Sequence, residues 1–129
     1  MTAPRKILVV DDEERVRDMI GFRLGLFGYE VLKAANGQEA LEIARQERPD
    51  LVLLDITMPE LDGFQVCSRL KQDEATENIP VIMLTARAEA EDVRRALESG
   101  ASDYIVKPYD PAVLQEKVSR NLPQKKELD

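Results

Sequence analysis

Histidine is absent from the 129 residues of this chain. Its absence excludes catalysis by a Ser-His-Asp triad or a Cys-His pair, zinc sites with histidine ligands, and a phosphohistidine carried by the chain itself. The single cysteine, Cys67, cannot form a disulfide within the chain, which is typical of a protein kept in a reducing cytosol. Chemistry must therefore come from carboxylates, lysines and hydroxyls, with or without a hard metal ion.

Long apolar runs and positive charge are also scarce. No apolar run approaches the length of a membrane span, and the N-terminal Met-Thr-Ala-Pro-Arg-Lys lacks the apolar centre of a signal peptide. The net charge of −7 disfavours direct nucleic-acid binding by this domain. With 43% hydrophobic and 33% charged residues, the composition is that of a globular protein with one core. We therefore expect one cytoplasmic domain without membrane contact.

Short apolar runs alternate with helical patterns along the chain. Runs at 6–10, 51–54 and 81–84 are continuous, which predicts strands buried on both faces. The mixed run at 29–34 predicts an edge strand, and 104–107 a short fifth strand. A helix is expected after each strand. The first ends at about Phe27, the second runs from an Asn36 cap to before Pro49, and the third includes Phe64–Leu70. The fourth covers Glu89–Ser99 with Val93, Ala96 and Leu97 facing inward, and the fifth runs from an Asp110 cap to Leu122.

Strands that alternate with helices pair in parallel, because each helix returns the chain in the same direction. The pattern predicts an α/β fold, a flavodoxin-like doubly wound (βα)5 three-layer sandwich whose five-stranded parallel sheet has the order 2-1-3-4-5. We expect one domain over residues 1–123, with 124–129 as a polar tail or the start of a linker.

Polar residues stand at the carboxyl end of four of these strands. Asp11 and Asp12 follow the first strand, Asp55 the third, Thr85 the fourth and Lys107 the fifth. Parallel strand ends share one edge of the sheet, and the order reverses between strands one and three. Three carboxylates gathered there repel one another, so a cation is needed. Only oxygen ligands are present, which favours Mg²⁺.

A carboxylate nucleophile, a metal, a lysine and a hydroxyl are the parts of a phosphoryl-transfer site. Each residue also has a simpler interpretation. Asp55 could be a turn residue, Asp11 and Asp12 helix-capping residues, Thr85 a hydroxyl that satisfies the backbone, and Lys107 an ordinary solvated lysine. These interpretations do not predict that all five residues meet at one edge of one sheet.

Five stretches carry a specific resemblance to a known family. They are Ile-Leu-Val-Val-Asp-Asp-Glu, Asp55-Ile-Thr-Met-Pro-Glu-Leu-Asp-Gly, Leu-Thr-Ala, Gly-Ala-Ser-Asp-Tyr and Lys-Pro-Tyr. From about Lys6 to Leu122, the chain resembles the receiver domain of a two-component response regulator, like the chemotaxis receiver. The resemblance implies that Asp55 accepts a phosphoryl group from a sensor histidine kinase or a phosphotransfer protein, and that a downstream output domain or protein is controlled.

The resemblance also implies roles for the residues around Asp55. Asp12, Asp55 and the Thr57 backbone carbonyl would bind Mg²⁺ directly, with Asp11 acting through water and Mn²⁺ as a substitute ion. Asp55, Lys107 and Thr85 would form the catalytic set.

A second group of implied roles concerns signalling. Thr85 and Tyr104 would be the switch pair, and the Lys107–Pro108 bond would be cis. Thr57 and Arg87 would flank the site where the family varies its dephosphorylation rate. The switched surface would be the one formed by the fourth helix, fifth strand and fifth helix.

In the family that the chain resembles, receivers of winged-helix transcription factors often dimerise through charged pairs on that same surface. Here Glu91, Asp103 and Lys117 are compatible with such pairs, whereas Val93, Ser102 and Val113 replace charged residues. We therefore expect a monomer or a weak phosphorylation-dependent dimer, with a contact between valines as an alternative.

Other function classes fit less well. A flavodoxin-type electron carrier needs a phosphate loop where this chain has Asp-Asp-Glu-Glu, and no strand is followed by the G-x-G-x-x-G of a dinucleotide site. An aspartyl-phosphate phosphatase needs a second aspartate where Thr57 stands. We expect self-catalysed phosphorylation and dephosphorylation rather than enzymatic turnover. The remaining alternative is a degenerate receiver that binds a protein without being phosphorylated.

Overall fold

Five parallel strands form the sheet in the computed structural model, which describes residues 4–86 and 90–123. The strands are β1 (Lys6–Val10), β2 (Glu30–Ala34), β3 (Leu51–Asp55), β4 (Val81–Thr85) and β5 (Asp103–Val106). The helices are α1 (Glu14–Leu26), α2 (Gly37–Glu47), α3 (Gly63–Gln72), α4 (Ala90–Glu98) and α5 (Pro111–Asn121). The strand order β2-β1-β3-β4-β5 confirms the predicted fold. Within the described ranges, no helix has the length and apolar character needed to cross a membrane.

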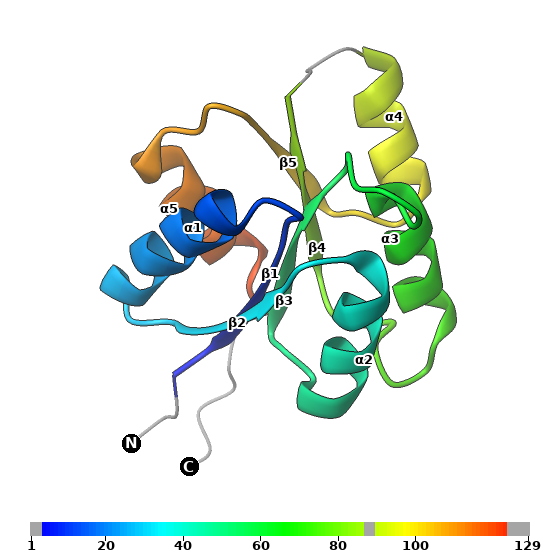
Figure 1. The fold of residues 1–129 in the computed structure, drawn as a ribbon, viewed down its shortest axis with the longest axis horizontal. Helices are drawn as coiled ribbons and strands as arrows, with labels where there is room; N and C mark the ends of the chain where they lie inside the picture. The colour runs from blue at the N-terminus through cyan, green and yellow to red at the C-terminus, as the bar shows by residue number, and fades with distance from the viewer. Residues whose placement is uncertain (1–3, 87–89, 124–129) are drawn as a thin grey trace.

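The sheet is covered on both faces, which explains the continuous apolar runs. Figure 1 shows α1 and α5 on one face and α2, α3 and α4 on the other. Leu51 and Leu53 belong to the core cluster on the α1–α5 side, while Val52 and Leu54 belong to the cluster on the α2–α4 side. Successive side chains of a strand point to opposite faces of the sheet. The residues on both faces must therefore be apolar when both faces are covered. The predicted edge strand at 29–34 is β2, which lies at the edge of the sheet.

Side-chain caps set where three helices begin. Asn36 accepts a hydrogen bond from the Glu39 amide at 2.8 Å, and Asp110 accepts one from the Ala112 amide at 2.8 Å. At α3, Asp62 and Gln65 form a reciprocal capping box that the sequence analysis did not predict. Each such cap stabilises a helix by about 1 kcal/mol.

Helix α3 begins in close contact with the end of β3. The Gly63 amide donates a hydrogen bond to the Ile56 carbonyl at 2.9 Å. A Cβ atom at Gly63 would lie 2.6 Å from the Asp55 carbonyl oxygen, closer than real side chains come. Glycine is therefore required here for α3 to pack against the backbone of Asp55.

The predicted inner face of the fourth helix was partly wrong. Leu97 was expected to point inward but is 51% exposed, whereas Ala96 is buried as expected. The Arg95 guanidinium lies 4.2 Å from the centre of the Phe64 ring of α3, so α4 turns the Arg95 side, not the Leu97 side, toward its neighbour. The predicted first residue, Glu89, lies outside the described residues.

Candidate functional site

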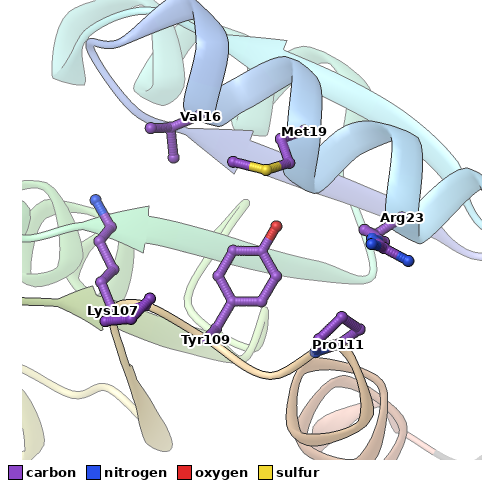
Figure 2. Close-up of a pocket in the computed structure, with 7 residues that line it drawn as sticks. Val16, Met19, Arg23, Lys107, Tyr109 and Pro111 are labelled. Atoms are coloured by element: carbon purple, nitrogen blue, oxygen red, sulfur yellow. The ribbon is translucent and has the colours of Figure 1, made fainter.

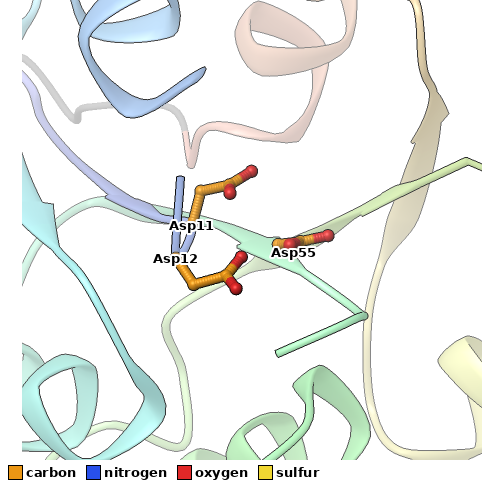
Figure 3. A group of neighbouring side chains, drawn as sticks. All are labelled: Asp11, Asp12 and Asp55. Atoms are coloured by element: carbon orange, nitrogen blue, oxygen red, sulfur yellow. The ribbon is translucent and has the colours of Figure 1, made fainter. Parts of the chain in front are cut away.

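Three carboxylates meet where β1 and β3 end. Asp11 and Asp12 follow β1, and Asp55 is the last residue of β3, the neighbouring parallel strand. Each offers one oxygen, and these oxygens lie within 4.8 Å of one another. Figure 3 shows the three side chains together at this edge of the sheet. Asp11 and Asp55 are 1% and 6% exposed, while Asp12 is open to solvent. The predicted convergence of these residues at one edge of the sheet is present in the structure.

Lys107 is the cation that was predicted to lie at the same edge of the sheet. It directly follows β5, and its Nζ lies 3.0 Å from Asp11 Oδ2 and 3.3 Å from Asp55 Oδ1. These partners are 96 and 52 residues away along the chain. The peptide bond from Lys107 to Pro108 is cis.

Negative charge is in excess at this site. Burial raises the pKa of Asp55 from 3.8 to about 6; Lys107 opposes that rise, and the charge of Asp11 adds to it. Burial lowers the pKa of Lys107, but hydrogen bonds and charge from Asp11 and Asp55 outweigh it, so the net shift is upward. Among the described residues, Lys107 is the cation that pairs with carboxylates of this cluster, and it does not compensate the cost of burying Asp55. The carboxylate-only donor set and the charge deficit both fit a hard divalent cation such as Mg²⁺.

Two threonines also lie beside Asp55. Thr85 ends β4, the strand that pairs with β3, and is buried; its carbonyl accepts a hydrogen bond from the Lys107 amide at 2.7 Å. The Thr57 amide lies 3.4 Å from Asp55 Oδ1. Asp11 additionally accepts the Glu13 amide at 2.9 Å, so its turn-forming role and its place in the acidic cluster coexist.

Tyr104 lies on β5, half-buried against the core cluster on the α2–α4 side. The Nζ atom of Lys117, on α5, lies 4.6 Å from the centre of its ring. Lys117 also pairs with Asp103 of the same chain at 3.0 Å, and Glu91 pairs with Arg94 at 3.2 Å. Arg87, named above beside the site, lies outside the described residues.

A pocket that the sequence analysis missed adjoins Lys107. Its volume is about 390 Å³, and Figure 2 shows Tyr109 pointing its hydroxyl toward α1 within it. The lining residues are Val16, Met19, Arg23, Lys107, Pro108, Tyr109 and Pro111. Lys107 therefore lines this pocket and also contacts the acidic site. No local motif marks the pocket, because its walls come from α1, from the segment after β5 and from the first residue of α5.

Comparisons with known proteins agree with this geometry. The family model described as the response regulator receiver domain matches residues 7–119. The chain is 50% identical over 113 residues to the probable transcriptional regulator ycf27 of Porphyra purpurea. The aligned region covers 88% of this chain and 45% of that protein. The curated relatives are longer proteins: this chain spans between 43% and 48% of their length.

Solved structures are similar over almost the whole chain. The chemotaxis protein CheY4 of Vibrio cholerae has a TM-score of 0.89 and 34% identity, covering 93% of this chain and 100% of that chain. The receiver domain of the sensor histidine kinase PA1611 from Pseudomonas aeruginosa has a TM-score of 0.85 and 34% identity, covering 92% of this chain and 98% of that chain. That receiver domain was solved with a magnesium ion in its active-site cleft.

Proposed function

The chain belongs to the family of response regulator receiver domains, and from that premise we propose that Asp55 is the residue that accepts a phosphoryl group. One observation carries the proposal. Asp55 ends a buried strand with two other carboxylates within 4.8 Å and the Lys107 ammonium at 3.3 Å. A merely structural ion pair needs one carboxylate for one lysine, so the excess of carboxylates supports a site for a cation and a reacting group.

The donor would be a phosphohistidine of a sensor histidine kinase or of a phosphotransfer protein. A carboxylate oxygen of Asp55 attacks phosphorus, the phosphorus–nitrogen bond breaks, and the imidazole leaves with the electron pair and takes up a proton. Lys107, already 3.3 Å from Asp55, neutralises charge on the phosphoryl oxygens. The Thr85 hydroxyl, at the end of the adjacent strand, donates a hydrogen bond to the bound group.

Asp12, Asp55 and the Thr57 carbonyl would hold Mg²⁺ directly, and Asp11 would act through water. When bound, Mg²⁺ would neutralise negative charge on the carboxylates and on the incoming phosphoryl group. The support in this chain is the all-carboxylate cluster and the raised pKa of Asp55. Mn²⁺ prefers the same oxygen ligands and is a second candidate ion.

Phosphorylation would be converted into a signal by the face formed by α4, β5 and α5. Thr85 moves toward the phosphoryl group, Tyr104 rotates inward, and the three elements repack. Residues 1–123 would form the receiver, with 124–129 as a tail or linker toward an output domain or protein. We expect a cytoplasmic monomer, or a weak phosphorylation-dependent dimer, that does not itself contact DNA. The name of the ycf27 relative, a transcriptional regulator, supports a transcriptional output.

The test is to incubate the chain with Mg²⁺ and acetyl phosphate and to measure its intact mass. We expect the wild type to gain the mass of one phosphoryl group and Asp55→Asn to gain none. Asp18→Asn, which alters an exposed carboxylate paired with Lys33, is the matched control and should label like the wild type. Equal labelling of Asp55→Asn would contradict the assignment. An unlabelled wild type would leave the alternative of a degenerate receiver that binds a partner without phosphorylation.

A further inference from the structure

Lys117 of α5 makes three contacts around β5. Its Nζ lies 3.0 Å from Asp103 Oδ1 and 2.6 Å from the Tyr104 carbonyl oxygen, to which it donates hydrogen bonds. The same ammonium lies 4.6 Å from the centre of the Tyr104 ring. One side chain therefore binds both the backbone and the aromatic ring of Tyr104.

These contacts connect the two faces of the sheet. The Tyr104 ring packs against the core cluster on the α2–α4 side, whereas Leu114 and Val118 of α5 belong to the cluster on the α1–α5 side. Because β5 is an edge strand, Lys117 can reach around it. A helix on one face thus contacts a ring on the other.

Asp103 fixes the position of the Lys117 ammonium. Its carboxylate is 14% exposed and also accepts hydrogen bonds from Arg120 at 2.9 Å, Asn121 at 3.1 Å and the Tyr104 amide at 2.8 Å. The Asp103 carboxylate and the Tyr104 carbonyl engage two of the three N–H donors of Lys117. The cation is therefore held beside the ring by its other partners, so its contact with the ring depends on where the ring lies.

We propose that Lys117 is a positioning residue that holds the Tyr104 ring in its present orientation and so limits the fraction of molecules able to accept a phosphoryl group. The inference rests on the proposed function, in which Tyr104 rotates inward when Asp55 is phosphorylated. An interaction made in only one of two conformations lowers the population of the other. Inward rotation would break the contact between the ring and the ammonium, whereas the contacts with Asp103 and the Tyr104 carbonyl can persist.

The first experiment compares rates of phosphorylation by acetyl phosphate and Mg²⁺, measured by intact mass. Lys117→Met keeps the aliphatic stem and removes the charge, and we expect labelling to become about two- to five-fold faster, the factor that corresponds to a partly exposed cation–π contact. Lys117→Arg keeps a cation and should restore the wild-type rate. Arg120→Met removes another cation from Asp103 without touching the ring, and should leave the rate unchanged.

The second experiment repeats the Lys117 substitution in a Tyr104→Leu background. If Lys117 acts through the ring, Lys117→Met should no longer change the rate there. For a wild type that is labelled, the proposal is overturned if Lys117→Met fails to speed labelling, if Arg120→Met speeds it equally, or if the effect persists in the Tyr104→Leu background. Thermal unfolding of each variant establishes that the compared proteins are folded.

A third measurement separates this proposal from the proposed function. The chain has three tyrosines, so Tyr29→Phe with Tyr109→Phe leaves Tyr104 as the only one. With 3-fluorotyrosine at this position, Lys117→Met should move the ¹⁹F resonance without any phosphoryl donor, and Arg120→Met should not. An unlabelled wild type with a Lys117-dependent resonance would overturn phosphorylation at Asp55 but keep Lys117 as the residue that positions the ring. A labelled wild type with an unchanged resonance would overturn the role of Lys117 alone.

Discussion

A lysine binds carboxylate groups near each end of β5, with opposite balances of charge. At the start of β5, the single carboxylate of Asp103 accepts hydrogen bonds from Lys117, Arg120 and Asn121. Just past its end, the single ammonium of Lys107 faces Asp11 and Asp55, and Asp12 lies in the same cluster. The same pair of residue types therefore builds a satisfied cluster at one end and a cluster short of positive charge at the other.

The pKa values of the two aspartates follow that difference. Burial favours the protonated form of both. At Asp55 burial prevails and raises the pKa to about 6. At Asp103 the hydrogen bonds from Arg120, the Tyr104 amide, Lys117 and Asn121 outweigh burial and lower the pKa to about 2. Asp55 is more buried than Asp103 and has fewer hydrogen-bond donors, and both differences distinguish a cluster suited to bind a cation and react from one that anchors a helix.

The largest expected effect comes from removing the lysine of the acidic cluster. Lys107→Met should slow phosphorylation by acetyl phosphate about 100-fold, because the charge that stabilises the transferring phosphoryl group is lost. The rate of mass gain at saturating Mg²⁺ measures this. Lys117→Met, the same substitution at the other end of β5, is the control and should not slow the reaction. Equal slowing of both variants would show that the two lysines are not functionally distinct.

The next effect concerns the stability of the satisfied cluster. Asp103→Asn should lower the free energy of unfolding by about 2 kcal/mol at pH 7, because Lys117 and Arg120 lose their shared counter-charge. Urea denaturation measures the change.

The pH dependence provides the check. Since the folded protein lowers the pKa of Asp103 from 3.8 to about 2, its contribution is present above about pH 4 and is lost as the pH falls toward 2. The difference between wild type and Asp103→Asn should therefore shrink over that range. A constant difference would show that ionisation of Asp103 is not its source.

The smallest expected effect has the opposite sign. Asp55→Asn should raise the free energy of unfolding by about 1 kcal/mol at pH 7.5 in EDTA, because it removes one of the mutually repelling carboxylates. The sign follows from the raised pKa: between about pH 4 and 6 the folded protein holds the proton more tightly than the unfolded chain, so stability falls as the pH rises through this range. Urea denaturation at pH 5 and pH 7.5 measures both effects.

Addition of Mg²⁺ is the control for the predicted stabilisation by Asp55→Asn. At several times its dissociation constant, Mg²⁺ should stabilise the wild type by about 1 kcal/mol and stabilise Asp55→Asn less. Asp103→Asn should keep the full response, since Asp103 is remote from the cluster. Destabilisation by Asp55→Asn in EDTA would show that the carboxylates are not in net repulsion.

The strands and the acidic cluster were predictable because each rests on a short-range pattern with a strong physical cause. A buried parallel strand must be apolar on both faces, and Asp55 directly follows such a run. The side of α4 that packs inward was only partly predictable: Ala96 is buried as expected, but Leu97 is exposed, because the contact of Arg95 with Phe64 joins two helices whose relative rotation no local pattern sets. For the same reason the partners Arg120 and Asn121 of Asp103 were missed: exposed polar residues on a helix do not reveal which carboxylate they reach.

The long sequence separation within the acidic cluster has a consequence for synthesis of the protein. Lys107 lies 52 residues beyond Asp55 and 96 beyond Asp11, so it emerges from the ribosome well after both. A nascent chain that ends before β5 would hold the three carboxylates without their cation and without the strand that positions it. Under the proposed function, such a chain would accept a phosphoryl group much more slowly than a completed domain, so a kinase would signal mainly through finished protein.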